Sequence, residues 1–325
     1  MAIKKRATKR YTKDIELCEV AKQFLITKKK STANVYKNRL ERFLEYYKKP
    51  IKTFIQEIEK EQELNKHRSI TERKRIAETI IRGYVEWMKE QGLSSHTINA
   101  YITTIQSLLA YYGIQFSTRW IELPPNHNMN KNKKHKWKLD EIKQFVDCCE
   151  YIRDKTIVIC LFQSGLAISD LLALNVAHVR KQLEKNDLPI MIDIIRKKTN
   201  INFKTFFGAD SAKYLKMYLK TRPQVRDSYP LFTMLGSHER ATPGAIQFTF
   251  RRYAEKIGIF SELDLEGWNP ARPHSFRSAF RSRLTNKMDR DLIEFMMGHS
   301  IGEVQQAYLF PMMNLRNSTL TLSMS

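Results

Sequence analysis

The feature that most constrains the fold is a break in the apolar pattern at residues 123–137, LPPNHNMNKNKKHKW. Two prolines and a run of asparagine, histidine and lysine replace the regularly spaced apolar residues found on either side. Such a composition interrupts helices and strands and is typical of a linker. A chain of 325 residues is long enough for two domains with separate cores. We therefore expect a basic tail over 1–13 and domains over 14–122 and 138–325.

The residues before this linker follow helical spacing. The clearest helix is capped by Ser94 or Ser95 and ends at Gly113. Its apolar residues recur every three or four positions, namely Ile98, Ile102, Ile105, Leu109 and Tyr112. Similar stripes predict helices near 14–29, 31–47 and 76–89, the second capped by Ser31 or Thr32. The first domain is therefore expected to be helical.

The residues after the linker add one β-hairpin to a helical pattern. Strands are expected over 189–198 and 201–207, with the turn near Thr199–Asn200. Helices are expected over 139–151, 156–163, 168–175, 211–221, 242–257, 276–285 and 289–297. The chain as a whole is thus predicted to be mainly α with a small β-sheet (α+β).

The charge balance is strongly basic. Lys and Arg number 56 against 34 Asp and Glu, a formal net charge of +22. Lysines and arginines that neutralise DNA phosphates release condensed counterions, which drives binding, although a basic protein without a nucleic-acid role has the same composition. The N-terminal MAIKKRATKRYTK lacks the apolar segment of a signal peptide, and no run of 18 apolar residues occurs. We expect double-stranded DNA as partner, no membrane association and a cytoplasmic location.

The cysteines give no sign of a metal or disulfide framework. Cys18, Cys148, Cys149 and Cys160 form no CxxC pair. Reduced, buried thiols account for them most simply. We expect neither a metal nor another cofactor.

Three short strings near the C-terminus carry the candidate chemistry. PHSFRSAF, FMMGHS and QQAYLF supply His274, Arg277, His299 and Tyr308. Each string alone is common in unrelated proteins. Their order and spacing are informative together: 3 residues separate His274 from Arg277, 25 separate His274 from His299, and 9 separate His299 from Tyr308.

This pattern resembles the tyrosine recombinases of the phage-integrase family, such as the Xer and Cre-like site-specific recombinases. That family combines a G-L-R-x-[SE]-[ED]-L box, a hairpin lysine, H-x-x-R, a G-H turn and a tyrosine about nine residues later. Here SGLAISDLLAL resembles the first box, IIRKKTNINF the hairpin, and GLSSHTINAYITTIQSLLAYYGI the helical core-binding domain. The resemblance implies a core-binding domain followed by a catalytic domain.

The resemblance also implies a role for each residue. Tyr308 would attack phosphorus and form a 3′-phosphotyrosine that conserves the bond energy, so that neither ATP nor a metal is needed. His274 would accept the phenol proton, because imidazole titrates near neutral pH. Arg277 offers a permanently charged fork to two phosphate oxygens, and His299 a second donor.

The departing 5′ oxygen needs a proton, which the resemblance assigns to the hairpin lysine. Lys198 is the first choice and Lys197 the second, since a shift of one residue points to the opposite face of a strand. Lys204 is a more distant third candidate. Each could instead contact the DNA backbone or be a solvated charge on the strand.

The first box lacks its arginine, because Ala167 holds that place. Arg180 follows the helix and is a poor substitute, whereas Asp170, which buttresses the site in the family, is present. Loss of one preorganised donor costs about 2.7–4 kcal/mol, or roughly 100- to 1,000-fold in rate. Ala167 is either an engineered Arg→Ala change or the mark of a naturally weak or regulated enzyme. Either way we expect good DNA binding, impaired cleavage, and more covalent adduct after Ala167→Arg.

The function that follows is site-specific DNA recombination or integration by a homo-tetramer on two DNA sites. The alternatives are a DNA-binding protein without catalysis and a type IB topoisomerase. The linker lysines, Lys131, Lys133, Lys134 and Lys136, would either follow the DNA backbone or belong to a solvated tether. The tail after Tyr308 would either dock on a neighbouring subunit or be a frayed end. A viral or mobile-element origin, or a place on the nucleoid, fits these properties, and an additional arm-binding domain is not expected.

Overall fold

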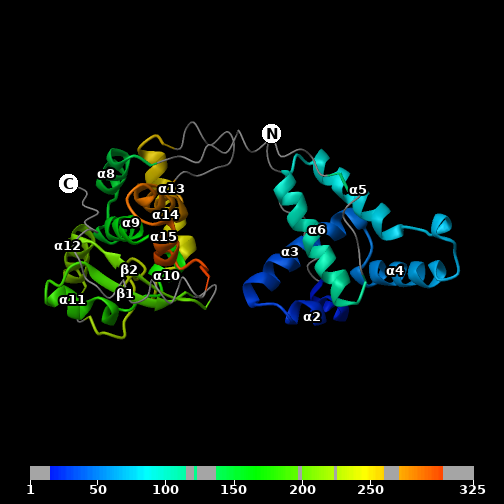
Figure 1. Cartoon of the computed structure of the whole chain (residues 1–325), viewed down its shortest axis with the longest axis horizontal. Helices are drawn as coiled ribbons and strands as arrows, with labels where there is room; N and C mark the ends of the chain where they lie inside the picture. Colours follow the sequence, from blue (N-terminus) through cyan, green and yellow to red (C-terminus); the bar gives the residue numbers. More distant parts are fainter. Residues whose placement is uncertain are drawn as a thin grey trace. The chain divides into compact units, whose positions relative to one another are not determined.

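The computed structural model divides into two compact units, residues 1–133 and 134–325, each of which is considered by itself (Figure 1). The division falls within the segment 123–137 that was expected to be a linker, and the exact domain boundaries stay a prediction. The structure describes residues 15–114, 121–122, 137–196, 200–222, 225–259 and 271–302.

The described part of the first unit is helical. Its α-helices are α2 (Glu19–Ile26), α3 (Lys30–Tyr47), α4 (Ile51–Asn65), α5 (Ile76–Glu90) and α6 (Ser95–Tyr111). Ser94 caps α6, since its hydroxyl accepts a hydrogen bond from the Thr97 amide at 3.3 Å. The predicted cap of α3 was wrong, because that helix begins at Lys30 without a side-chain cap.

Helix α4 was not among the predicted helices. Its buried residues Ile51, Phe54, Ile55 and Ile58 nevertheless follow the i, i+3, i+4, i+7 spacing of an amphipathic helix. They join the apolar faces of the neighbouring helices in one core that is rich in aromatic contacts, such as Phe43 against Phe54 with ring centroids 4.9 Å apart. The unit thus has a hydrophobic core of its own.

The second unit combines helices with a two-stranded sheet. Its elements are α8 (Leu139–Cys148), α9 (Ile152–Ser164), α10 (Ile168–Leu171), α11 (Arg180–Glu184), β1 (Ile190–Ile195), β2 (Asn202–Phe207), α12 (Ala209–Lys220), α13 (Pro243–Lys256), α14 (Pro273–Leu284) and α15 (Arg290–Met296). The predicted helix over 168–175 was wrong in length, since α10 is a single turn. The prediction of a mainly α chain with a small β-sheet is confirmed.

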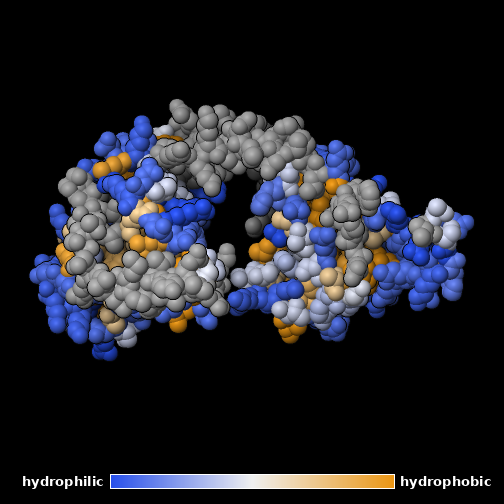
Figure 2. Space-filling model, viewed as in Figure 1, coloured by the Kyte–Doolittle hydropathy of each residue, from blue (hydrophilic) through white to orange (hydrophobic). Residues whose placement is uncertain are grey.

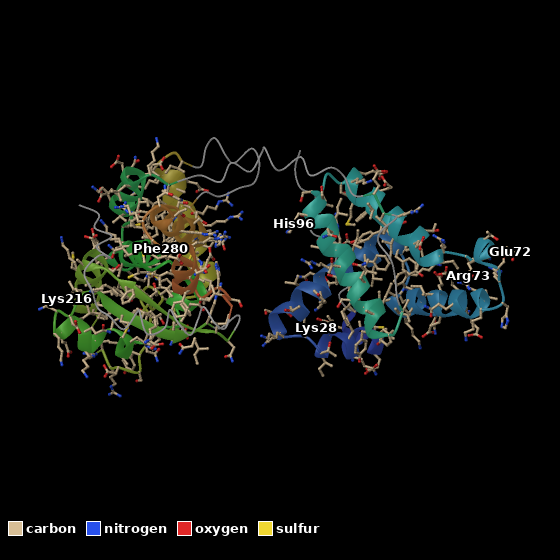
Figure 3. The ribbon with its side chains drawn as sticks, in the orientation of Figure 1. Lys28, Glu72, Arg73, His96, Lys216 and Phe280 are labelled. Carbon is tan, nitrogen blue, oxygen red and sulfur yellow. The ribbon has the colours of Figure 1, made fainter. Side chains whose placement is uncertain are left out.

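Helix α9 is the centre of this unit. Eleven of its residues are buried, because α8, α12, α14, α10 and β2 pack around it (Figure 1). It ends at Gly165, which has a left-handed backbone (φ +64°) and lies against α14. A Cβ at this position would lie 2.3 Å from Cδ1 of Phe280, which is labelled inside the unit in Figure 3. Glycine here therefore allows the loop after α9 to approach α14 closely.

The hairpin is antiparallel, with Ile190 opposite Phe207 and Ile195 opposite Asn202. Beyond β1, the Arg196 amide donates to the Ile201 carbonyl and the Asn200 amide donates to the Arg196 carbonyl, both at 2.8 Å. These bonds hold the base of the turn. They fix the backbone from which the Arg196 side chain extends.

The described residues on the face shown in Figure 2 are mostly hydrophilic. On the face shown in Figure 2, hydrophobic residues of the second unit lie in small patches between charged and polar ones. Among the described helices, none is both long and apolar enough to cross a membrane.

Candidate active site

The structure describes four of the predicted catalytic residues, Arg277, His299, His274 and Ala167. Tyr308 and Lys198 lie outside the described residues, and so does Lys197. The same holds for the predicted DNA-contacting lysines of the linker, Lys131, Lys133, Lys134 and Lys136.

Arg277 lies in α14 and is the largest fully buried side chain among the described residues, with 2% of its surface exposed. Its Nη1 donates to the carbonyl of Gly165 and its Nη2 to the carbonyl of Met297. The guanidinium thus joins the loop after α9 to the end of α15. Burial and the positive charge of Arg196 lower the pKa of Arg277 to about 10, against the opposing effect of Asp170 and Glu294, so it stays charged at neutral pH.

His299 follows the turn that ends α15. Its Nε2 lies 2.9 Å from Nη2 of Arg277, and its Nδ1 contacts the carboxylate of Glu294. Arginine can only donate and a carboxylate can only accept. The two contacts together therefore require the hydrogen to be on Nδ1 and leave Nε2 as the acceptor. The structure brings Arg277 and His299 together, although 22 residues separate them in the sequence.

Glu294 is a residue of this site that the motifs did not reveal. It accepts from His299 and also pairs with Arg281. Burial alone would raise the pKa of Glu294, but the hydrogen bond from His299 and the charge of Arg281 outweigh it and lower the pKa. The carboxylate is thus charged and holds the imidazole of His299 in one orientation.

His274 is the second residue of α14 and is exposed. It precedes Arg277 by three residues, so both lie on one side of the helix. The neighbouring Ser275 accepts a hydrogen bond from the Trp137 indole at 3.0 Å, which fixes the start of this helix. His274 therefore reaches solvent from the same helix that buries Arg277.

Ala167 is the N-cap residue of α10 and is half-buried. Its carbonyl accepts from the amides of Asp170 and Leu171, each at 2.9 Å. Its methyl side chain supplies neither charge nor a donor. The Asp170 carboxylate one turn later is buried, with 2% of its side chain exposed.

A second guanidinium, which the sequence did not reveal, lies beside this carboxylate. Arg196 Nη1 donates to the carbonyl of Gly298 at 2.7 Å, and its Nε lies 3.7 Å from Oδ2 of Asp170. The sequence signal was limited to three consecutive basic residues at the end of a strand. Which of them faces the site depends on a register that the sequence does not fix.

Lys204, the third lysine candidate, lies in β2 directly opposite Asp193. Its ammonium is 3.6 Å from Oδ2 of that residue, and its side chain is 7% exposed. An exposed carboxylate of the same hairpin thus partly neutralises Lys204. This ion pair counts against Lys204 as the proton donor.

The described residues contain no group of three or more His, Cys, Asp or Glu side chains placed to hold a metal ion. All four cysteines are free: Cys149 and Cys160 are buried, whereas Cys18 and Cys148 are half-buried. Burial raises the pKa of Cys160. Cys160 therefore stays a protonated, apolar part of the core.

Comparison with known proteins gives a consistent result. The phage integrase family model matches residues 137–313, more than half of the chain. Tyrosine recombinase XerC of Thermodesulfovibrio yellowstonii is 23% identical over 296 residues, covering 85% of this chain and 84% of that protein. Tyrosine recombinase XerA of Pyrococcus horikoshii is 22% identical over 226 residues, covering 68% of this chain and 71% of that protein.

Two solved structures have the same fold. The Tn1549 transposon integrase in complex with circular intermediate DNA gives a TM-score of 0.59 at 18% identity, covering 91% of this chain and 94% of that one. The XerH site-specific recombinase bound to its difH substrate gives 0.56 at 16% identity, covering 86% and 75%. At these identities the likeness concerns the fold alone.

Proposed function

Because this chain belongs to the phage integrase family of tyrosine recombinases, we propose that it is a site-specific DNA recombinase that works through a covalent phosphotyrosine at Tyr308. The observation that carries this proposal is the contact of Arg277 with His299 at 2.9 Å. Both residues were selected from short motifs in the sequence, and the family match extends through them to Tyr308. Their meeting in space supports the roles assigned to the motifs.

The proposed reaction exchanges one phosphate ester for another. The Tyr308 oxygen bonds to phosphorus, His274 takes the phenol proton, and the bond to the 5′ oxygen breaks. Lys198 gives that oxygen its proton, with Lys197 as the alternative. Arg277 stabilises charge on the nonbridging oxygens. His299 Nε2, which accepts from Arg277 in this structure, donates to the phosphate only when it is protonated.

Double-stranded DNA is the proposed partner. A net charge of +22 suits a polyanion, the Tn1549 integrase is described in complex with DNA, and XerH is described as bound to its difH substrate. We further propose a homo-tetramer on two DNA sites, with a core-binding domain over 14–122, a catalytic domain over 138–325, and the linker lysines between them contacting the backbone.

The test is formation of a covalent adduct on a nicked duplex from which the cleaved fragment can diffuse away. The duplex is first selected by binding from a random library, since the target sequence is unknown. We expect Tyr308→Phe to abolish the adduct while a gel shift persists. Tyr151→Phe, which changes an exposed tyrosine of the same unit, is the matched control and should retain the adduct. An adduct that survives Tyr308→Phe would refute the proposal.

The other candidate is a DNA-binding protein without catalysis, which the missing guanidinium at Ala167 favours. It predicts a gel shift and no adduct from the unaltered chain. Relaxation of any supercoiled plasmid would instead indicate topoisomerase chemistry. The same set of assays therefore separates the three functions.

A further inference from the structure

The position that lacks its expected arginine lies at one edge of a charged cluster. Ala167 caps α10, and Asp170, whose amide is bonded to the Ala167 carbonyl, directs its buried carboxylate toward Arg196. The position where a guanidinium was expected is therefore one helical turn from Asp170, and the Asp170 carboxylate pairs with the guanidinium of Arg196. Positions 167 and 196 are 29 residues apart in the sequence.

The Arg196 side chain is held in this place by its surroundings. Its Nη1 donates to the Gly298 carbonyl at 2.7 Å, and backbone hydrogen bonds to Ile201 and Asn200 fix its main chain. A Cβ at position 298 would lie 3.1 Å from Arg196 Cδ. The glycine before His299 thus leaves room for the Arg196 stem, which links the hairpin to the G-H turn.

The cluster carries more positive than negative charge near its centre. Arg277 and Arg196 lie close enough for the charge of Arg196 to lower the pKa of Arg277. The charges of Asp170 and Glu294 oppose this effect, but Asp170 pairs with Arg196, and Glu294 already contacts Arg281 and His299. Two guanidinium groups held together in a largely buried site repel each other and lose hydration, which is unfavourable without a further anion. A phosphodiester has the charge and the oxygen geometry that a guanidinium binds best.

Arg277 and Arg196 differ in their burial and in the number of backbone carbonyls to which they donate. Arg277 is almost fully buried, and its Nη1 and Nη2 donate to two backbone carbonyls. Arg196 keeps 13% of its side chain exposed and donates to one carbonyl. Arg196 is thus the more accessible cation of the pair.

We propose that Arg196 supplies the phosphate-binding guanidinium that Ala167 cannot supply. The proposal rests on the recombinase function proposed above and names a further catalytic residue for it. Arg196 contacts a nonbridging oxygen of the scissile phosphate beside Arg277, and Asp170 orients Arg196. The missing charge at 167 is then replaced from the hairpin, and the unaltered chain cleaves DNA.

The first experiment measures adduct formation at saturating DNA. Arg196→Ala is expected to lower the rate by about 100- to 1,000-fold, the usual loss for one transition-state donor, with DNA affinity changed less than about tenfold. Arg180→Ala is the matched control, because Arg180 binds Asp227 and the Val225 carbonyl instead. It removes the same charge from the same unit and should cleave normally. Cleavage by Arg196→Ala within threefold of the unaltered rate overturns the proposal.

The second experiment separates phosphate binding from a merely structural role. A methylphosphonate at the mapped cleavage position removes the nonbridging charge that Arg196 would neutralise. On this substrate Arg196→Ala should cleave nearly as fast as the unaltered chain, and Ala167→Arg combined with Arg196→Ala should recover cleavage of ordinary DNA. A loss that is equal on both substrates identifies a structural role and overturns the proposal. If Arg196→Ala does not fold, Arg196→Gln keeps a donor for the Gly298 carbonyl and serves the same test.

These outcomes are distinct from failure of the proposed function. Adduct formation that requires Tyr308 but not Arg196 leaves the recombinase assignment intact and removes only the role of Arg196. Adduct formation that is independent of Tyr308 removes both.

Discussion

At the scale of single residues, the described site is a series of contacts in which each side chain orients the next. Glu294 holds His299, His299 contacts Arg277, and Arg277 is bonded to the carbonyls of Gly165 and Met297. The backbone carbonyls fix Arg277, whereas the imidazole of His299 contacts two side chains, Arg277 and Glu294. The orientation of the imidazole therefore depends on Glu294. A residue outside the motifs thus determines which nitrogen of His299 faces Arg277.

Glu294→Gln is therefore expected to impair cleavage through His299. Glutamine keeps an acceptor but loses the charge that attracts both His299 and Arg281. A hydrogen bond to a charged group contributes about 1.5–3 kcal/mol, so the adduct rate should fall about tenfold or more, with DNA affinity nearly unchanged. Glu255→Gln, which breaks an exposed ion pair with Arg251, is the control. An unchanged rate and pH profile in Glu294→Gln would show that His299 is oriented by other groups.

The same substitution has a pH-dependent effect on stability. The folded-state pKa of Glu294 lies below its ordinary value of 4.5. A carboxyl with a depressed pKa stabilises the fold above its unfolded-state pKa, and this contribution is lost as the pH falls through the folded-state pKa. The unaltered chain should be more stable than Glu294→Gln at pH 7, and the difference should shrink below about pH 4.5. Urea unfolding of both proteins at several pH values measures this difference in the free energy of unfolding.

At the scale of elements, the turn between α15 and His299 depends on Gly298. This residue has φ +65°, and a Cβ on it would lie 2.9 Å from Cδ1 of Phe203. Gly298→Ala should destabilise the protein by about 1–3 kcal/mol through backbone strain, with a further loss from the clash. Gly236→Ala is a matched control, because Gly236 has φ +69° but no atom within 4 Å of an added Cβ. Thermal unfolding that shifts equally in both variants would rule out the clash.

The elements also show how far the sequence predicts this site. Arg277 and His299 could be found because H-x-x-R and G-H are local strings on recognisable helices and turns. Arg196 could not, because its role arises from contacts with Asp170 of α10 and with Gly298 after α15, which no local spacing encodes. Glu294 lies only five residues before His299, but it belongs to none of the three motif strings. Amphipathic periodicity predicted most helices, and it was present in α4 although that helix was not predicted. The apolar pattern predicted a helix longer than α10, because apolar residues continue after that helix ends at Leu171.

At the scale of the whole molecule, the chain carries two separate hydrophobic cores. Among the described residues, one core uses positions 15–114 and the other positions 142–297, and no buried residue belongs to both. A protein unit with its own core can fold alone. We therefore expect residues 1–133 and 134–325, produced separately, to be folded and to unfold in one cooperative transition each.

The covalent connection between the two units should strengthen DNA binding. If both units contact one DNA site, binding of the first raises the local concentration of the second, so the intact chain should bind about 100-fold or more tightly than either unit. An equimolar mixture of the two separate units is the control, because it has the same contacts without the covalent link. Fluorescence anisotropy on the selected duplex at fixed salt measures all four samples. Equal affinity of the intact chain and residues 134–325 would mean that the first unit contributes nothing to DNA binding, and its assignment as a core-binding domain would then be wrong.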